Sequence, residues 1–178
     1  MLLLSAEVER LLSAAPARLP LLQAGLQPAV DASSVRQQGA ALLFPDARQE
    51  QAALAGLLLR VGCWEESHAV AQDVQSVEGS YWHGIIHRME PDSFNAGYWF
   101  RQAGQHAIFP ELFRRATEIL KNGGPKHWRL RNSWDSSLFV EWCDEARERG
   151  GEAEATALEI QMTEWQLLFD WCAAKDSR

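Results

Sequence analysis

Cysteine is scarce in this chain, and the few thiols form no recognisable pattern. Cys63, Cys143 and Cys172 are odd in number, far apart, and include no C-x-x-C pair. This spacing argues against a disulfide framework and a zinc knuckle, and predicts small buried thiols in a reducing compartment. The N-terminal segment is apolar for only a few residues before Glu7 and Glu9, unlike a signal peptide. We therefore expect a cytoplasmic protein.

Long hydrophobic runs and an excess of basic residues are also missing. No apolar stretch approaches the roughly 18 residues needed to cross a bilayer, so we expect a soluble protein without a membrane partner. Lys and Arg number 17 against 24 Asp and Glu, a formal net charge of −7. Because such a surface repels phosphate backbones, nucleic acid is not expected as the main partner. Glycine-rich phosphate loops and nucleophile elbows are absent as well.

Period-two alternation, the mark of half-buried strands, is absent over any useful length. Helical periodicity is present instead, bounded by capping residues, glycines and prolines. We predict a single all-α domain over residues 1–178, with about seven helices in an antiparallel bundle or an array of helical hairpins. Prolines at 16, 20 and 28 predict a less regular segment over about residues 15–45, with at most one helical turn.

Hydrogen-bonding and aromatic side chains are concentrated in residues 78–106, EGSYWHGIIHRMEPDSFNAGYWFRQAGQH. The segment contains three of the five histidines, two of the eight tryptophans and both tyrosines. Ser80 is the expected cap of its first helix, and Pro91 forces that helix to end at or before Glu90. The apolar face of this helix consists of Trp82, Ile85, Ile86 and Met89. His83, His87 and Glu90 form a second stripe about 110° around the helix, at the edge of the buried face.

A third histidine, His68, is expected opposite this stripe. If its helix is the antiparallel neighbour of the next, His68 and His87 both lie about 10 Å from the connecting turn, with His83 one turn nearer to it. Three imidazoles so placed are typical ligands of a divalent ion such as Zn²⁺, Ni²⁺ or Fe²⁺. Four carboxylates could complete or orient the site: Glu66, Asp73, Glu90 and Asp92. Gly84 occupies the position where H-E-x-x-H metalloproteases carry their general base, which excludes that class.

The sequence leaves open whether the protein is an enzyme. In a catalytic site, His83 or His87 would transfer a proton or bind the metal, Glu90 or Asp92 would orient it, and Arg88 or Arg101 would clamp an anion. The candidate residues for binding a small polar ligand are Tyr81, Asp92, Asn95, Tyr98 and Arg101.

Two other interpretations stay open for the histidines. They could form a polar pocket without metal, or they could be structural and hold together a tetratricopeptide-like module of helical hairpins that binds other proteins. Self-association is compatible with every one of these interpretations.

The same segment resembles a family of bacterial and fungal proteins with a YWH-G-I-x-HR-x-EPD…NA-x-YWFR-x-x-G-x-H core. The resemblance covers about residues 64–112, beginning with WEESHAVAQD. It implies a common lineage and no specific chemistry. NAGYWFRQAG is also similar to one helix of tetratricopeptide or Sel1-type repeats, but the recurrence of 34–36 residues is missing, which indicates convergence in a helix-packing position.

Overall fold

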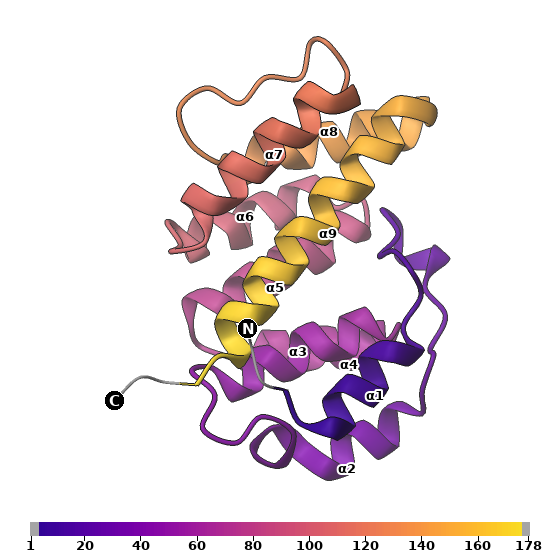
Figure 1. Cartoon of the computed structure of the whole chain (residues 1–178), viewed down its shortest axis with the longest axis vertical. Helices are drawn as coiled ribbons and strands as arrows, with labels where there is room; N and C mark the ends of the chain where they lie inside the picture. Colours follow the sequence, from indigo (N-terminus) through magenta and orange to yellow (C-terminus); the bar gives the residue numbers. More distant parts are fainter. Residues whose placement is uncertain (1–3, 176–178) are drawn as a thin grey trace.

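The computed structural model describes residues 4–175, and its regular structure over that range is helical (Figure 1). The helices are α1 (Ala6–Ala14), η1 (Gln23–Gly25, a 3-10 turn), α2 (Ala32–Leu43), α3 (Glu50–Arg60), α4 (Trp64–Asp73), α5 (Val77–Met89), α6 (Ser93–Ala103), α7 (Phe109–Gly123), α8 (Ser136–Arg149) and α9 (Gly151–Ala173). The only strand-like pairing in this range is an isolated bridge between Ala47 and Lys175. The all-α prediction is confirmed, and residues 4–175 contain nine α-helices instead of the roughly seven expected.

Helix α2 lies where the prolines predicted irregular chain. Asp31 caps its first turn by accepting a hydrogen bond from the Ser33 N–H at 3.0 Å. A proline restricts only itself and the residue before it, and none occurs between Pro28 and Pro45. The helix bends at Gly39, where φ is +72°. The prediction of irregular chain is therefore wrong for residues 32–43. Between residues 15 and 30 the regular structure is limited to the 3-10 turn η1, as predicted.

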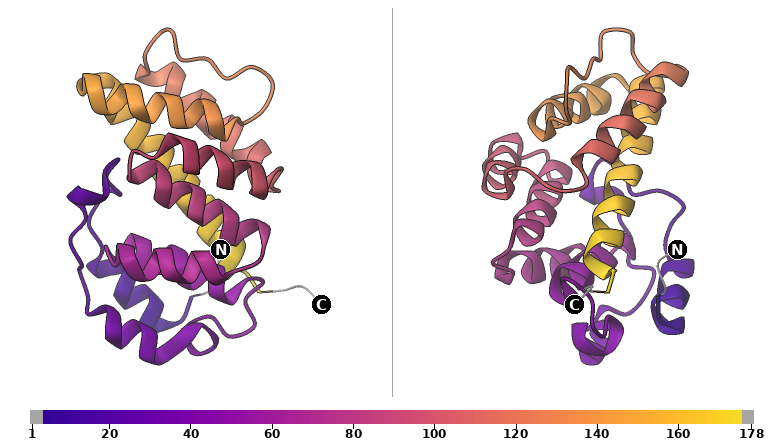
Figure 2. Two further views of the ribbon diagram at one scale, coloured as in Figure 1. Left: turned by 180° about the vertical axis from the view of Figure 1, so that it is seen from behind. Right: turned by 60° about the vertical axis from the view of Figure 1, so that its left-hand side comes forward.

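The helices cross one another in several directions and do not form a simple antiparallel bundle (Figures 1 and 2). Helix α9 runs obliquely through the molecule and packs against α3, α7 and α8. Consecutive helices form packed pairs, notably α3 with α4, α4 with α5, α5 with α6 and α8 with α9. Hairpin pairing is thus observed, whereas the bundle arrangement is not. None of the described helices combines the length and the apolar character that a bilayer-spanning segment needs.

Helix α5 is buried along most of its length because α3, α4 and α6 all pack against it. It begins one turn earlier than expected, since Ser76 and not Ser80 is the cap and accepts a hydrogen bond from the Gly79 N–H at 3.2 Å. Its last residue is Met89, so Pro91 ends it where predicted. At Gly84 an added Cβ would lie 2.9 Å from the Phe100 ring. Close packing of α6 therefore requires glycine between the two histidines of α5.

Candidate metal centre

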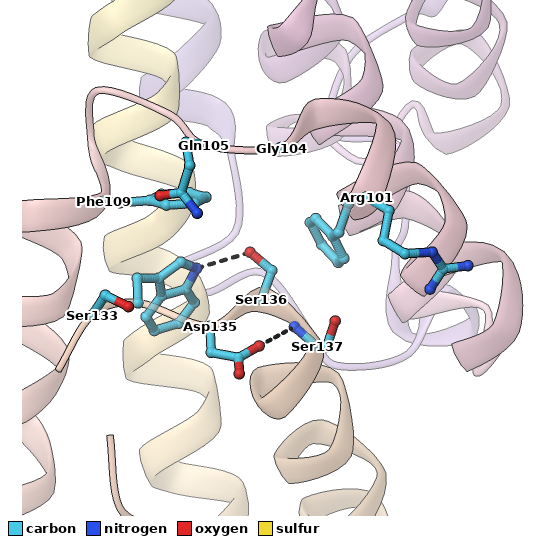
Figure 3. Close-up of a pocket in the computed structure, with 10 residues that line it drawn as sticks. Arg101, Gly104, Gln105, Phe109, Ser133, Asp135, Ser136 and Ser137 are labelled. Carbon is cyan, nitrogen blue, oxygen red and sulfur yellow. Dashed lines mark hydrogen bonds between the residues drawn. The ribbon is translucent and has the colours of Figure 1, made fainter. Parts of the chain in front are cut away.

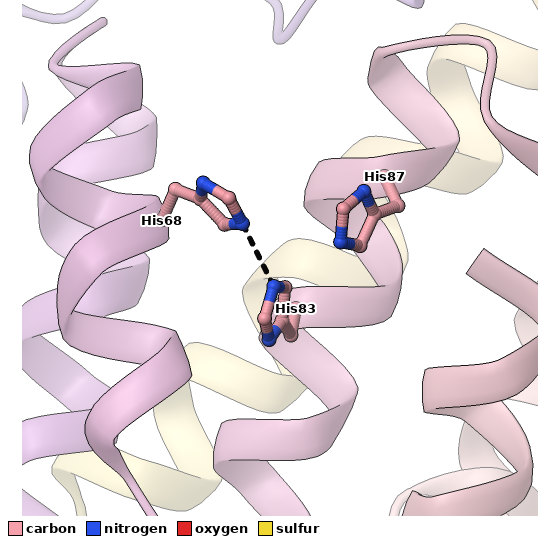
Figure 4. A group of neighbouring side chains, drawn as sticks. All are labelled: His68, His83 and His87. Atoms are coloured by element: carbon pink, nitrogen blue, oxygen red, sulfur yellow. Dashed lines mark hydrogen bonds between the residues drawn. The ribbon is translucent and has the colours of Figure 1, made fainter. Parts of the chain in front are cut away.

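Helices α4 and α5 bring His68, His83 and His87 together (Figure 4). One ring nitrogen from each residue lies within 4.8 Å of the corresponding atoms of the other two. His83 and His87 are one turn apart on α5, and His68 projects toward them from α4 (Figure 4). The three side chains come together because α4 and α5 pack side by side across a short connection. This proximity was predicted from the rise per residue of the two helices.

His68 and His83 contact each other directly. Their Nε2 atoms are 2.8 Å apart, so one proton or one cation must lie between the two nitrogen lone pairs. The His83 ring also stacks on Trp99, with centroids 4.0 Å apart and planes inclined by 21°. This stacking restricts the rotation of His83, which is only 3% exposed.

His87 is oriented by a carboxylate. Its Nδ1 lies 2.6 Å from Glu90 Oε2, which leaves Nε2 free to bind an external group. A carboxylate behind the imidazole fixes the ring orientation and raises the basicity of the other nitrogen, as in carboxylate–histidine–zinc triads. Glu90 is the C-cap of α5, so the end of the helix that Pro91 enforces also positions the carboxylate. Of the two orienting residues predicted, Glu90 makes this contact.

The surroundings of His68 and His83 lower their pKa values and so favour the neutral imidazole. Burial, together with the positive charges that His68 and His87 can carry, lowers the pKa of His83 to about 4. Burial likewise lowers the pKa of His68, with a contribution from His87 and partial compensation by Glu90. Neutral imidazole is the form that binds metal ions, so near pH 7 these two rings need not lose a proton first.

Two half-buried tryptophans flank the cluster, and sequence reasoning did not assign them to the site. Trp99 of α6 stacks on His83. The Trp64 ring centroid is 5.3 Å from that of His68, one turn away on α4. The indole Nε1 of Trp64 is buried without a hydrogen-bond partner among the described residues. The i, i+4 spacing of Trp64 and His68 was a usable signal, whereas the contribution of α6 depends on tertiary packing.

Arg88 and Tyr81, predicted as an anion clamp and a ligand-binding residue, belong to a different cluster. Arg88 Nη2 pairs with Glu164 Oε2 at 2.6 Å, and the Tyr81 hydroxyl donates to Glu164 Oε1 at 2.9 Å. Gln161 accepts a longer hydrogen bond from Arg88, at 3.4 Å. Arg88 is 1% exposed, so its guanidinium is not accessible to a ligand at the histidines. Burial and the negative charge of Glu164 raise the pKa of the Tyr81 phenol well above its ordinary value.

The remaining predicted residues do not line the histidine cluster in a common site. Asp92 caps α6 by accepting hydrogen bonds from the Asn95 N–H at 3.0 Å and the Asn95 side-chain amide at 2.7 Å. Tyr98 is exposed and contacts the edge of Trp99. Arg101 lines another cavity. Over residues 4–175 the metal-ligand group consists of the three histidines alone, so the predicted carboxylates Glu66, Asp73, Glu90 and Asp92 add no ligand to it.

Comparisons of the chain with protein-family models, with curated proteins and with solved structures gave no match, so the family resemblance seen in residues 64–112 stays a prediction.

Proposed function

We propose that His68, His83 and His87 bind one divalent transition-metal ion. The observation that carries this proposal is the convergence of three ring nitrogens within 4.8 Å, one of them on a histidine whose other nitrogen is bound by a carboxylate. Imidazole suits Zn²⁺, Ni²⁺ and Fe²⁺, and three histidine ligands are a known catalytic zinc set. The lowered pKa values of His68 and His83 support the same conclusion, because they keep both ligands deprotonated at neutral pH.

The distances require only small side-chain adjustments. With metal–nitrogen bonds of about 2.0–2.1 Å, neighbouring ligands of a tetrahedral ion lie about 3.3 Å apart. The His68 and His83 nitrogens, now 2.8 Å apart, would separate by about half an ångström when a metal replaces the shared proton. The third nitrogen, on His87, would move inward by rotation about its side-chain bonds.

Three protein ligands leave at least one coordination position open. In zinc enzymes that position holds a water molecule or the substrate, and the metal lowers the pKa of the water to near 7. We propose that a small polar ligand with an oxygen donor occupies it here. In a reaction at this centre, Glu90 would act on His87 as a positioning residue. Nucleic acid is not among the proposed partners, given the net charge of −7.

The test is metal content and metal affinity of the purified protein. We expect one equivalent of Zn²⁺, Ni²⁺ or Fe²⁺ by elemental analysis and calorimetry, and its loss in the His83→Ala/His87→Ala double variant. His127→Ala is the matched control, because His127 is an exposed loop histidine paired with Glu145. Ni²⁺ should also quench tryptophan fluorescence, since Trp64 and Trp99 contact the ligand rings. Sub-stoichiometric metal in every preparation, with no saturable titration, would overturn the proposal.

A structural role for the histidines is the second candidate, favoured by the direct hydrogen bond between His68 and His83. That bond joins α4 to α5 without any metal, as expected in a helical-hairpin interaction module. The double variant distinguishes the two roles. A large loss of stability with unchanged metal content would support the structural role, whereas lost metal binding with melting nearly unchanged in chelator would support the metal centre.

A further inference from the structure

Two aromatic side chains on the outer face of α6 are exposed to solvent. Phe94 is 81% exposed and Tyr98 is 45% exposed, whereas every other aromatic side chain within residues 4–175 is buried or half-buried. The two residues are four apart in one helix, so they lie on the same face, one turn from each other. Single exposed apolar residues are ordinary on a protein surface, but an adjacent aromatic pair is typical of an interaction surface.

Arg101 lies one turn beyond Tyr98 on the same face of α6. It is exposed, and its guanidinium lies beside Gly97, where an added Cβ would be 3.1 Å from Arg101 Nη1. Figure 3 shows that this side chain points away from the neighbouring cavity around Ser136. Within residues 4–175, Arg101 forms no ion pair and no cation–π contact. The face therefore combines two aromatic rings with one unpaired cation.

This face is accessible and carries no carboxylate. Helices α5 and α8 pack against α6, which lies at the outside of the molecule (Figure 2). Residues 93–106 contain no Asp or Glu, although the whole chain has a net charge of −7. Two copies of an acidic chain repel each other on average, and a contact through a face without carboxylates minimises that repulsion.

We propose that this face is the contact of a symmetric homodimer, in which the α6 helices of two copies pack antiparallel across a two-fold axis near Tyr98. In a two-fold contact the same residues meet from both sides, so the face has to be complementary to itself. Phe94 precedes Tyr98 and Arg101 follows it, so the antiparallel arrangement places Arg101 of each copy against the aromatic pair of the other. Each guanidinium gains a cation–π contact, and the rings lose their exposure to water.

The small size of the contact sets its expected strength. A single helix face buries less than the roughly 1,200 Å² at the lower end of standard interfaces, so we expect weak dimerisation with a Kd on the order of 100 µM. The experiment is sedimentation velocity in a dilution series that spans this Kd. Chelator is present throughout, so that no metal ion joins the copies and the result does not depend on the proposed metal centre.

We expect a reversible equilibrium between monomer and dimer. Phe94→Ser should weaken dimerisation about tenfold, as removal of a central aromatic anchor does in other interfaces. Arg101→Ala should weaken it about threefold through loss of the cation–π contact. Leu42→Ser is the matched control, because Leu42 is 67% exposed on α2, outside the proposed contact, and its replacement should leave the equilibrium unchanged.

Dilution of the ¹⁵N-labelled protein, followed by NMR, locates the contact independently. We expect amide signals of residues 93–103 to shift with protein concentration. Any one of three results would overturn the proposal: a monomer throughout the dilution series, equal dimerisation of the wild type, Phe94→Ser and Arg101→Ala, or concentration-dependent shifts confined to another surface.

Discussion

At the scale of single residues, Glu78 keeps its charge in a buried position because its neighbours donate hydrogen bonds to it. The Trp171 indole N–H donates to Glu78 Oε1 at 3.1 Å, and His106 Nε2 lies 3.5 Å from the same oxygen. Burial alone would raise the pKa of this carboxyl. Favourable polar contacts with His106, its own backbone, Ser76 and Trp171 outweigh burial and lower the pKa to about 2. These contacts connect α5 to the α6–α7 connection and to α9.

The lowered pKa predicts an acid-labile contribution to folding. Because the folded pKa lies below the ordinary value of 4.5, the stabilisation is complete above pH 4.5 and is lost as the pH falls toward 2. Its full size is about 2–3 kcal/mol in the free energy of unfolding. Urea denaturation of the wild type and Glu78→Gln should differ by about this amount at pH 6 and by much less at pH 3. A difference independent of pH would contradict the assignment to the Glu78 charge.

At the scale of elements, α5 and α6 pack closely where Gly84 lies between them. Gly84 of α5 faces the Phe100 ring, where an added Cβ would approach to 2.9 Å. Gly97 of α6 is also buried, but an added Cβ there would meet only the flexible Arg101 guanidinium, at 3.1 Å. The same substitution is thus expected to have opposite effects at the two positions.

Gly84→Ala should destabilise the protein by about 1–3 kcal/mol, because Phe100 or the helix backbone must shift to accommodate the methyl group. Gly97→Ala should be neutral or stabilising by up to about 1 kcal/mol, since alanine is the better helix former. Denaturant midpoints of the two variants against the wild type measure both effects. Equal destabilisation by the two substitutions would contradict the close contact at Gly84.

The α4–α5 pair gives a second prediction at this scale, which depends on the proposed metal centre. An ion that binds only the folded protein stabilises it by about 2.7 kcal/mol at 100 times its Kd. For a chain of this size we expect Zn²⁺ to raise Tm by about 5–10 °C relative to chelator-treated protein. His83→Gln should abolish the rise, because glutamine retains polarity but binds zinc poorly. The His127→Ala control should keep the rise, and a shift of the same size in His83→Gln would refute the assignment.

At the scale of the whole molecule, a buried ion pair joins the last helix, α9, to α5 in the middle of the chain. Glu164 of α9 receives hydrogen bonds from Arg88 and Tyr81 of α5, and the side chains of Arg88 and Glu164 are wholly buried. The Arg88 guanidinium also lies 4.5 Å above the Phe139 ring of α8. The cluster therefore couples α5, α8 and α9, and its loss should affect cooperative unfolding and not one helix alone.

Removing one partner of this pair should be strongly destabilising. Glu164→Leu leaves Arg88 charged and buried, which is expected to cost about 3–5 kcal/mol. The double variant Arg88→Met/Glu164→Leu should recover most of that loss, because no unpaired charge remains. Chemical denaturation of the two single variants and the double variant completes a double-mutant cycle. Additive effects of the two substitutions would contradict the buried pair.

The sequence predicted most helices, because caps, prolines and glycines act locally. Pro91 ends α5 where expected, and the positions of the i, i+4 histidines and of His68 opposite them followed from the rise and spacing of residues in a helix. Helix α2 was missed because the effect of three prolines was extended beyond the residues that they restrict.

What the sequence determined by itself is therefore the helical class and the meeting of the three histidines, since both follow from periodicity and from a short connection between neighbouring helices. Only the tertiary structure decided the rest. Trp99 reached His83 through the packing of α6, and Arg88 turned away from the histidines to Glu164 on α9, 76 residues further along the chain. Which distant side chains meet depends on how whole helices pack, because contacts between remote segments leave no local pattern in either segment.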